Sequence, residues 1–441
     1  MLTREQSQAM VKRILSFSTF PECTVSIRES EQSFVRFANN GVTTAGLTTE
    51  RNITVSSTRE TRTGTAQTSE MDESALRAVV ARSEQIASIA PPSAEHMAPL
   101  GEQQYPPVPA MDPETAEARS GIMVPHVRAV IDAAAAKKLI AAGFFERSTD
   151  ASTLANKHGL FGYLRSADTG LSTTIRNPEG TSSGWASQPA ARISEISGAA
   201  LAETAIQKCL RWKNPRRLDP GKYTVVLEPT AVNDLLGMFG FSFSARNAEE
   251  GRSFLSKKGG GTQLGEKLFS ESVTLVTDPF DARNPGSPWS TGGLPSAKIG
   301  WVENGVVKNL YYDRYWASKT GKSPTPPPAS LRLEGGNHSL EQLIAATARG
   351  LIVTRFWYIR PVNMQTLQLT GLTRDGLFLI EDGKITDPVM NLRFNESPVR
   401  MLQNVLKLGR VSHCRGGEGN GMLAPALQAA NFTFSSISDA V

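Results

Sequence analysis

The sequence is poor in the features that mark membrane, secreted and disulfide-bonded proteins. It has no run of about 18 apolar residues, which excludes a conventional transmembrane helix, and residues 1–17 lack the continuous apolar core of a signal peptide. Its three cysteines, Cys23, Cys209 and Cys414, are too widely separated for a disulfide framework or a metal-binding knuckle. We therefore expect a cytoplasmic protein with reduced thiols and no membrane partner.

An excess of charge of one sign is also missing. Lys and Arg number 47 and Asp and Glu number 42, so the net charge is +5 over 441 residues. Without a long Lys/Arg run, this mild excess does not predict a nucleic-acid-binding surface. The hydrophobic fraction of 39% and the charged fraction of 20% indicate a globular protein with a sizeable core, and the length favours two domains.

The first half alternates helical and strand patterns. Thr3 followed by Gln6 is typical of a capping box and predicts an amphipathic helix. From Cys23 to Gln67 apolar residues alternate around the hairpin signal Asn39-Asn40-Gly41, so we expect a small antiparallel sheet. The remaining predicted elements are a helix within 69–87 capped by Asp72 or Ser74, a proline-rich crossing at 91–113, two helices within 114–142 broken near Pro125, strands within 141–185 and a helix at 191–212.

The second half is dominated by strand and loop patterns. Asn304-Gly305 and Asp382-Gly383 each predict a hairpin, and the repeated Pro and Gly residues of 278–295 predict a long irregular loop. The other predicted elements are a strand at 273–276, a helix at 397–406, a glycine-rich turn at 415–422 and a last strand at 432–434. We expect an α+β protein with an N-terminal α/β domain at 1–215 and a β-rich C-terminal domain at 216–441.

The chain is organised around residues 222–255. Tyr223 to Leu227 form a β-branched and aromatic run of strand length, and Pro229 lies where a helix would begin. The following residues, up to Phe243, are apolar on nearly all sides of a helix. Such a pattern predicts a helix that is buried deep in the domain.

This stretch resembles the TldD/TldE (PmbA) family, long labelled modulators of DNA gyrase and regarded as peptidases that act on unfolded peptides. The resemblance extends to the hairpin at 303–305, the Tyr-containing segment 310–319 and the Gly/Pro/Ser loop 321–330. In metal-bearing members this helix carries HExxxH, whose histidines hold a metal while the glutamate activates water. Aligning LLHEAVGH-type text with 235–242 places Gly237 and Ser242 at the ligand positions and Met238 at the position of the base.

These substitutions remove the chemistry that the family motif supplies. A hydrolytic metal centre needs imidazole, thiolate or carboxylate ligands and a group that accepts a proton, and Gly237, Met238 and Ser242 offer none of these. The resemblance is therefore to a TldE-like member without a catalytic residue, metal ligand or cofactor of its own. It implies zinc in a TldD-like partner subunit, with a second copy of this chain as the other possible partner, and an unfolded peptide as substrate.

Cys414 is the one position that retains a piece of the family site. Metal-bearing members supply a third ligand from a cysteine near the C-terminus, ahead of a glycine-containing turn, and Cys414 precedes Gly416-Gly417. One ligand, or two with His413, does not complete a zinc site. A Cys/His nucleophilic pair is also disfavoured because adjacent residues of an extended strand point to opposite faces. We interpret Cys414 as a relic ligand or a packing residue.

Other candidate residues have simpler interpretations. His338 precedes a predicted helix and is typical of a surface loop, and the glycines at 259–261 lack the spacing of a phosphate-binding loop. Segment 355–360 places aromatic residues between two arginines, which would suit base stacking, but its alternation favours a strand. The histidines without an acidic or cysteine partner at ligand spacing are His96, His126 and His158.

Three hypotheses about function remain open. The first is a metal-free subunit that acts with a metal-bearing partner in peptide cleavage. The second is an active metallopeptidase with an atypical site, and the third is a stand-alone peptide-binding homodimer. A β-rich half with exposed strand edges would suit the first of them, because such edges bind extended peptides through main-chain hydrogen bonds.

Overall fold

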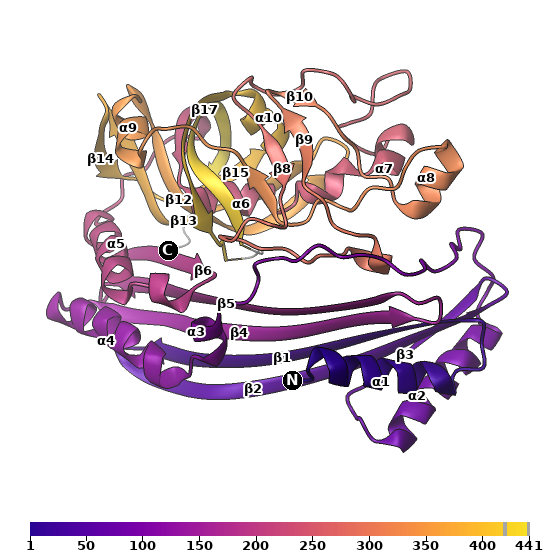
Figure 1. Ribbon diagram of the computed structural model, residues 1–441. Coiled ribbons are helices and arrows are strands. Elements are labelled where there is room, and N and C mark those ends of the chain that lie inside the picture. Colours follow the sequence, from indigo (N-terminus) through magenta and orange to yellow (C-terminus); the bar gives the residue numbers. More distant parts are fainter. Residues whose placement is uncertain (418–420, 439–441) are drawn as a thin grey trace.

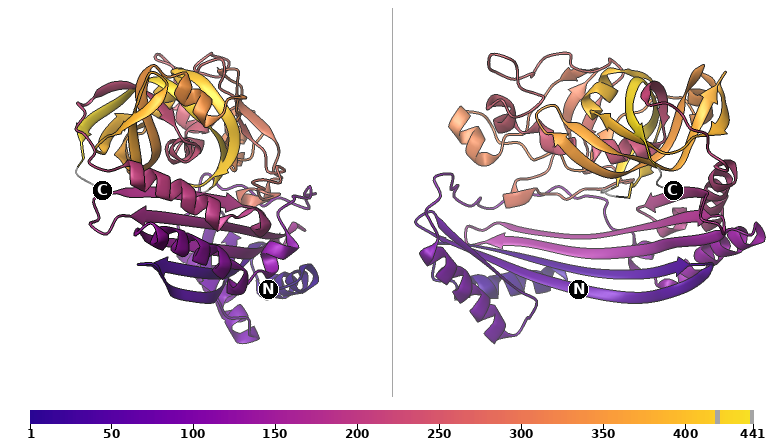
Figure 2. Two further views of the ribbon diagram at one scale, coloured as in Figure 1. Left: turned by 90° about the vertical axis from the view of Figure 1, so that its left-hand side faces the viewer. Right: turned by 180° about the vertical axis from the view of Figure 1, so that it is seen from behind.

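The computed structural model describes residues 1–417 and 421–438, which form two sheets stacked one above the other (Figure 1). In this part of the chain the first sheet has six antiparallel strands in the order β3-β2-β1-β4-β5-β6, and the second has eleven strands. Helices α1, α2 and α4 cover the face of the first sheet that points away from the second sheet (Figure 2). The two sheets confirm the predicted α+β class.

The first sheet is built from long hairpins. Its strands are β1 Glu22–Ala38, β2 Gly41–Arg59, β3 Arg62–Thr68, β4 Ile140–Asn156, β5 Phe161–Arg176 and β6 Ser183–Ala190. Its helices are α1 Arg4–Phe17, α2 Glu73–Ile89, α3 Pro113–Glu117, α4 Ser120–Ala136 and α5 Gly198–Arg211, with the short 3-10 helix η1 Ile193–Glu195 before α5. The sheet is larger than predicted because β4, β5 and β6 join the strands of residues 22–68.

Local signals in the sequence account for several of these elements. The capping box is present, with Thr3 accepting from the Gln6 backbone and Gln6 accepting from the Thr3 backbone. Asp72 caps α2, and Asn39 and Asn40 adopt positive φ values of 50° and 59° at the β1–β2 turn. These predictions are therefore confirmed.

The predicted helix break at Pro125 is wrong. Pro125 lies inside α4, and the break between α3 and α4 falls at Ala118 and Arg119. The buried Arg147 of β4 donates to the Ala118 carbonyl through Nε at 3.0 Å and Nη2 at 2.7 Å. A contact between distant segments thus determines where the helix ends, whereas Pro125 loses only one backbone hydrogen bond near the start of α4.

The second sheet carries the C-terminal half. Its strands are β7 Gly221–Leu227, β8 Leu275–Thr277, β9 Ile299–Glu303, β10 Val306–Val307, β11 Leu331–Leu333, β12 Arg349–Asn363, β13 Gln368–Glu381, β14 Lys384–Pro388, β15 Leu392–Glu396, β16 Val405–Cys414 and β17 Met422–Ile437. The helices are α6 Pro229–Leu236, α7 Ala245–Glu249, α8 Arg314–Thr320, α9 Leu340–Ala345 and α10 Pro398–Gln403, with 3-10 helices η2 Gly240–Phe243 and η3 Thr291–Gly293.

Strand pairing closes part of this sheet on itself. β17 pairs with β7, β11, β15 and β16, and its pairing with β7 joins β7, β12, β13, β15 and β17 into a ring. The predicted hairpins are confirmed, because Asn304-Gly305 joins β9 to β10 and Asp382-Gly383 joins β13 to β14, all four with positive φ. Part of the predicted 415–422 turn lies outside the described residues.

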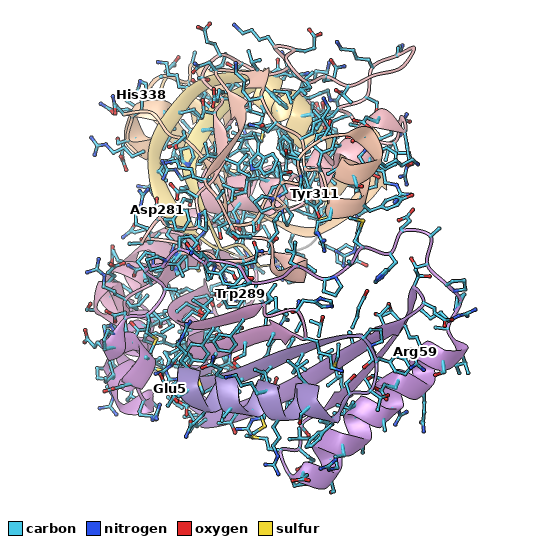
Figure 3. The ribbon with its side chains drawn as sticks, turned by 45° about the vertical axis from the view of Figure 1, so that its right-hand side comes forward. Glu5, Arg59, Asp281, Trp289, Tyr311 and His338 are labelled. Atoms are coloured by element: carbon cyan, nitrogen blue, oxygen red, sulfur yellow. The ribbon has the colours of Figure 1, made fainter. Side chains whose placement is uncertain are left out.

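Two irregular segments, the proline-rich crossing at 91–113 and the loop at 278–295, lie between the sheets. Tyr105, in the proline-rich crossing, donates to the Gly293 carbonyl at 2.7 Å, and its ring lies 5.1 Å from that of Trp289. Trp289 lies between the two sheets in Figure 3. Asp281 fixes the start of the 278–295 loop, since Arg283 and Arg332 each lie 2.7 Å from its carboxylate, and the hydrogen bond from Arg283 lowers the pKa of Asp281 to about 2.

The chain passes from α5, which packs against β6 of the first sheet, to β7, which opens the second sheet. We propose this connection as the boundary between a domain at 1–215 and a domain at 216–441. Among the described residues, none of the helices has the length and apolarity needed to span a membrane.

Candidate functional site

Helix α6 lies at the centre of the candidate site. It follows β7, which pairs with β12 on one side and β17 on the other. Glu228 occupies the N-cap and Pro229 the first turn, where a missing N–H costs no hydrogen bond. The buried residues of the helix are Ala231, Val232, Asn233, Leu235 and Leu236. The prediction of a deeply buried helix is confirmed for this segment.

The helix is shorter than the sequence pattern predicts. It ends at Leu236, and the apolar residues that follow form the 3-10 helix η2 rather than further α-helical turns. A Cβ on Gly240 would lie 3.2 Å from the Pro328 carbonyl, so the 321–330 loop approaches the backbone directly at this point. The Phe239 and Phe243 rings pack at 5.6 Å beyond the turn. Packing between distant segments therefore ends the helix.

The three family positions lie in different surroundings. Gly237 is exposed at the end of α6, and Met238 packs against the core of the C-terminal half. Ser242 is buried in η2, where its carbonyl accepts from Ser253 Oγ at 3.1 Å. Because α6 ends before Met238, these positions do not form one face of a single α-helix.

Cys414 ends β16 beside α6. Its side chain is 4% exposed, and Sγ lies 3.4 Å from the Met422 carbonyl. Burial raises the pKa of the Cys414 thiol to about 12, and the negative charge of Asp234 acts in the same direction. The thiolate, which is the form that binds metal or attacks a substrate, is therefore strongly disfavoured.

His413 lies in a different environment from Cys414. Burial and the charge of Arg415 lower the pKa of His413 to about 4, with Asp281 opposing and Arg283 adding to this effect. The imidazole is thus neutral near pH 7. Asp234 affects the pKa of Cys414 but is not among the charged groups that affect the pKa of His413. The two side chains therefore face different surroundings, as expected for adjacent residues of a strand.

The donor set at the family positions does not fit a metal. Gly237 has no side chain, Met238 and Ser242 are poor ligands, and Cys414 is a buried neutral thiol. Within residues 1–417 and 421–438, no three His, Cys, Asp or Glu side chains are grouped as metal ligands. We assign no metal-dependent step to these residues.

The polar residues of α6 instead hold neighbouring backbone segments. Asn233 Oδ1 accepts from the Gly416 N–H at 2.7 Å, and Asp234 Oδ2 accepts from the Phe356 N–H at 2.9 Å. A Cβ on Gly416 would lie 1.7 Å from Asp234 Oδ1, so only glycine fits there. We did not predict these roles, although two adjacent polar residues in an otherwise apolar helix are a visible signal.

A buried ion pair of the second sheet contacts β6 of the first sheet close to this turn. Arg355 Nε donates to Asp375 Oδ2 at 2.8 Å, and Ser183 of β6 donates to Asp375 Oδ1 at 2.8 Å. The Arg355 guanidinium lies 4.6 Å from the Trp185 ring centroid and 5.5 Å from that of Trp357. The segment 355–360 is thus part of strand β12, as predicted. Its first residue, Arg355, has a structural role as the positive partner of the buried ion pair.

The face of the first sheet that points toward the second is acidic near this junction. Arg415 Nη1 donates to Glu146 Oε1 at 3.0 Å across the two sheets. The pKa of Asp168 on β5 is raised to about 6 by desolvation, with Asp150 and Glu146 adding to the shift and Arg415 opposing it. The Asp168 side chain is nevertheless exposed to water, so solvent screens part of this effect.

The remaining candidates have structural roles or are exposed. His338 Nδ1 lies 3.1 Å from the Leu408 carbonyl, far from α6 on the outside of the C-terminal half (Figure 3). His96 lies 3.0 Å from Glu22, His126 packs edge-on against Phe145, and His158 is exposed. The glycines at 259–261 all have positive φ in an open turn and do not begin a helix.

We predict that the native protein resists thiol alkylation. Cys23, Cys209 and Cys414 are all buried, and burial raises the pKa of each thiol. Counting alkylated cysteines by mass spectrometry after brief exposure to iodoacetamide should give almost none in buffer and all three in denaturant. Rapid modification of Cys414 in the folded protein would contradict its placement beside α6.

Comparisons with known proteins show which family and fold the chain resembles. Residues 220–436 match the family described as the PmbA/TldA metallopeptidase C-terminal domain. A metalloprotease of Methanothermobacter thermautotrophicus is 27% identical over 211 residues, 43% of each chain, and an uncharacterized protein of Methanocaldococcus jannaschii is 37% identical over 106 residues, 24% of each chain. These alignments span less than half the length of either relative.

Similar solved structures cover nearly the whole chain. TldE from Thermococcus kodakarensis has a TM-score of 0.87 at 19% identity, covering 97% of this chain and 99% of its own. A proposed modulator of DNA gyrase from Thermotoga maritima has a TM-score of 0.85 at 17% identity, covering 97% and 100%. The solved structures show that the whole chain shares their fold, and through the sequence match of residues 220–436 the chain belongs to the PmbA/TldD family.

Proposed function

We propose that this chain is a TldE-like, metal-free subunit that acts with a metal-bearing partner of the same family in the cleavage of unfolded or modified peptides. The observation that carries the proposal is the loss of metal-binding chemistry at α6. Gly237, Met238 and Ser242 stand where HExxxH would lie, and the remaining family-like ligand, Cys414, is a buried neutral thiol. The catalytic zinc would then belong to the partner.

The retained architecture supports a role in binding rather than in catalysis. Asn233 and Asp234 keep the turn at Gly416 against α6, and Arg355 with Asp375 keeps the two sheets together. The cost of a buried ion pair is offset here by hydrogen bonds and by two tryptophan rings. A rigid junction of this kind suits a subunit that presents a fixed surface to a partner and to an extended peptide.

Two alternatives make different predictions. An active metallopeptidase with an atypical site needs three or four protein ligands, and no such group occurs among the described residues. A stand-alone peptide-binding homodimer needs no metal and no homologous partner. The active-enzyme alternative does not explain why the family positions are lost together, and the homodimer alternative differs from the proposal in needing no metal-bearing partner.

The proposal is tested by co-expressing the chain with a metal-bearing homologue. We expect a complex on size-exclusion chromatography that cleaves unfolded peptides, with stoichiometric zinc in the partner and little in this chain by elemental analysis. Zinc that copurifies with this chain alone and disappears with Cys414→Ala would favour the active-enzyme alternative. Peptide cleavage by the isolated chain would contradict the proposal outright.

A further inference from the structure

Strand β2 leaves a long sheet edge unpaired. Residues 41–52 pair with β1 on one side, and β3 begins to pair with β2 only at Ile53. Within the described part of the chain, no strand lies on the other side of 41–52. Figure 1 shows this part of β2 along the lower margin of the first sheet, with β3 confined to one end. Its backbone groups on that side are free to pair.

From Thr44 to Thr49, beyond the bulge at Thr43, this edge lacks the features that normally prevent association. Proteins usually protect edge strands with lysines, prolines or inward-pointing charges. Residues 41–49 contain no charged residue and no proline, and the first charges are Glu50 and Arg51. Val42 and Leu47 are 51% and 50% exposed, among the most exposed large apolar side chains of the first sheet. The edge is therefore suited to pair with another strand.

The sequence of the edge is nearly symmetric about one residue. Residues 43–49 read Thr-Thr-Ala-Gly-Leu-Thr-Thr, with Gly46 at the centre. If two copies pair in antiparallel fashion about Gly46, Thr44 lies opposite Thr48 and Ala45 lies opposite Leu47 on both sides of the axis. Cross-strand threonine pairs and apolar pairs each stabilise a sheet, and a two-fold contact requires such a self-complementary surface.

The geometry of β2 is compatible with this register. The bulge opposite Arg36 and Phe37 falls at Thr43, so the strand is regular from Thr44 onward. Glu50 and Arg51 would lie outside the central ladder, so no like charges would face each other. Gly46 carries no side chain at the axis, where a Cβ would lie 3.2 Å from the Phe34 ring. Phe34 stacks on Phe144 at 5.6 Å and covers this point from one face.

We propose that the β2 edge is a self-association surface, through which two copies of this chain join their N-terminal sheets by antiparallel pairing about Gly46. The result is a continuous sheet that crosses both copies. The occupant of the edge is a second copy because the segment nearly matches its own reverse and carries no net charge to attract an oppositely charged partner. This inference does not depend on the proposed function.

A pair of charge designs tests both the contact and its register. In Thr44→Lys/Thr48→Lys, a lysine of one copy faces a lysine of the other at two positions, whereas Thr44→Lys/Thr48→Glu places opposite charges there. Sedimentation velocity over a range of concentrations should show that the unmodified chain forms a dimer. The lysine pair should raise the dissociation constant of this dimer about tenfold or more, whereas the lysine/glutamate design should retain the dimer.

A matched control separates the contact from a general charge effect. Thr65→Lys/Gln67→Lys adds the same charge to exposed positions of β3 in the same sheet and should leave the dimer unchanged. Circular dichroism melting checks that every variant is folded. A monomeric unmodified chain, a dimer that survives the lysine pair, or equal loss in both designs would overturn the proposal. So would an edge that pairs only with a metal-bearing homologue.

Discussion

Replacement of Asp375 by alanine is expected to lower the free energy of unfolding by about 3–5 kcal/mol, because it removes one partner of a buried ion pair. The Arg355 side chain would remain buried beside Trp185 without a counter-ion. Arg374, whose Nε lies 3.8 Å from the same carboxylate, would then face Arg355 as a like charge. Urea unfolding followed by fluorescence measures the loss.

The control for this prediction is an exposed ion pair in the C-terminal half of the chain. Asp387 lies 2.9 Å from Arg216 and is 48% exposed, so Asp387→Ala should cost less than about 1 kcal/mol. Asp375→Asn keeps the shape of the side chain and tolerates the positive φ of 55° at this position, so an intermediate loss is expected. Equal free energies of unfolding for Asp375→Ala and Asp387→Ala would contradict the stabilising role of the buried ion pair.

Gly416→Ala is expected to destabilise the protein by about 1–3 kcal/mol, because the added methyl group meets a held carboxylate. Its Cβ would lie 1.7 Å from Asp234 Oδ1 and 3.1 Å from Asn233 Oδ1. Asp234 is unable to move away without giving up its bond from the Phe356 N–H. Unfolding curves measure the loss, and faster alkylation of the neighbouring Cys414 would report local opening of the turn.

Gly237→Ala provides the matched substitution. Its Cβ would lie 3.4 Å from the Asn233 carbonyl, an ordinary contact, and the residue is exposed with right-handed helical φ and ψ. We expect it to be neutral or slightly stabilising. If Gly416→Ala were as well tolerated as Gly237→Ala, the close approach between α6 and the end of β16 would be incorrect.

The sequence predicts best those elements that short-range chemistry determines. The Thr3/Gln6 capping box and the Asn304-Gly305 and Asp382-Gly383 turns depend on residues close in the chain, and all are found where they are expected. The break expected at Pro125 and the helix expected up to Phe243 are wrong because distant groups intervene. Arg147 reaches the Ala118 carbonyl in one case, and Pro328 approaches Gly240 in the other.

The candidate site is harder to predict for the same reason. Its contacts join residues far apart in the chain: Asp234 and Phe356 are separated by 122 positions, and Ser183 and Asp375 by 192. The resemblance to a family directed attention to Gly237, Met238, Ser242 and Cys414, which the structure places at or near α6. It gave no reason to expect that Asn233, Asp234 and Asp375 would organise the surroundings.

The position of β17 in the second sheet has a consequence for biosynthesis. This strand, Met422–Ile437, provides pairing partners for β7, β11, β15 and β16. While the ribosome is still translating the preceding residues, those four strands lack a common neighbour and their apolar faces stay open to solvent. The C-terminal half is therefore expected to need protection by chaperones until β17 has been translated, whereas the N-terminal sheet is able to fold as soon as it emerges.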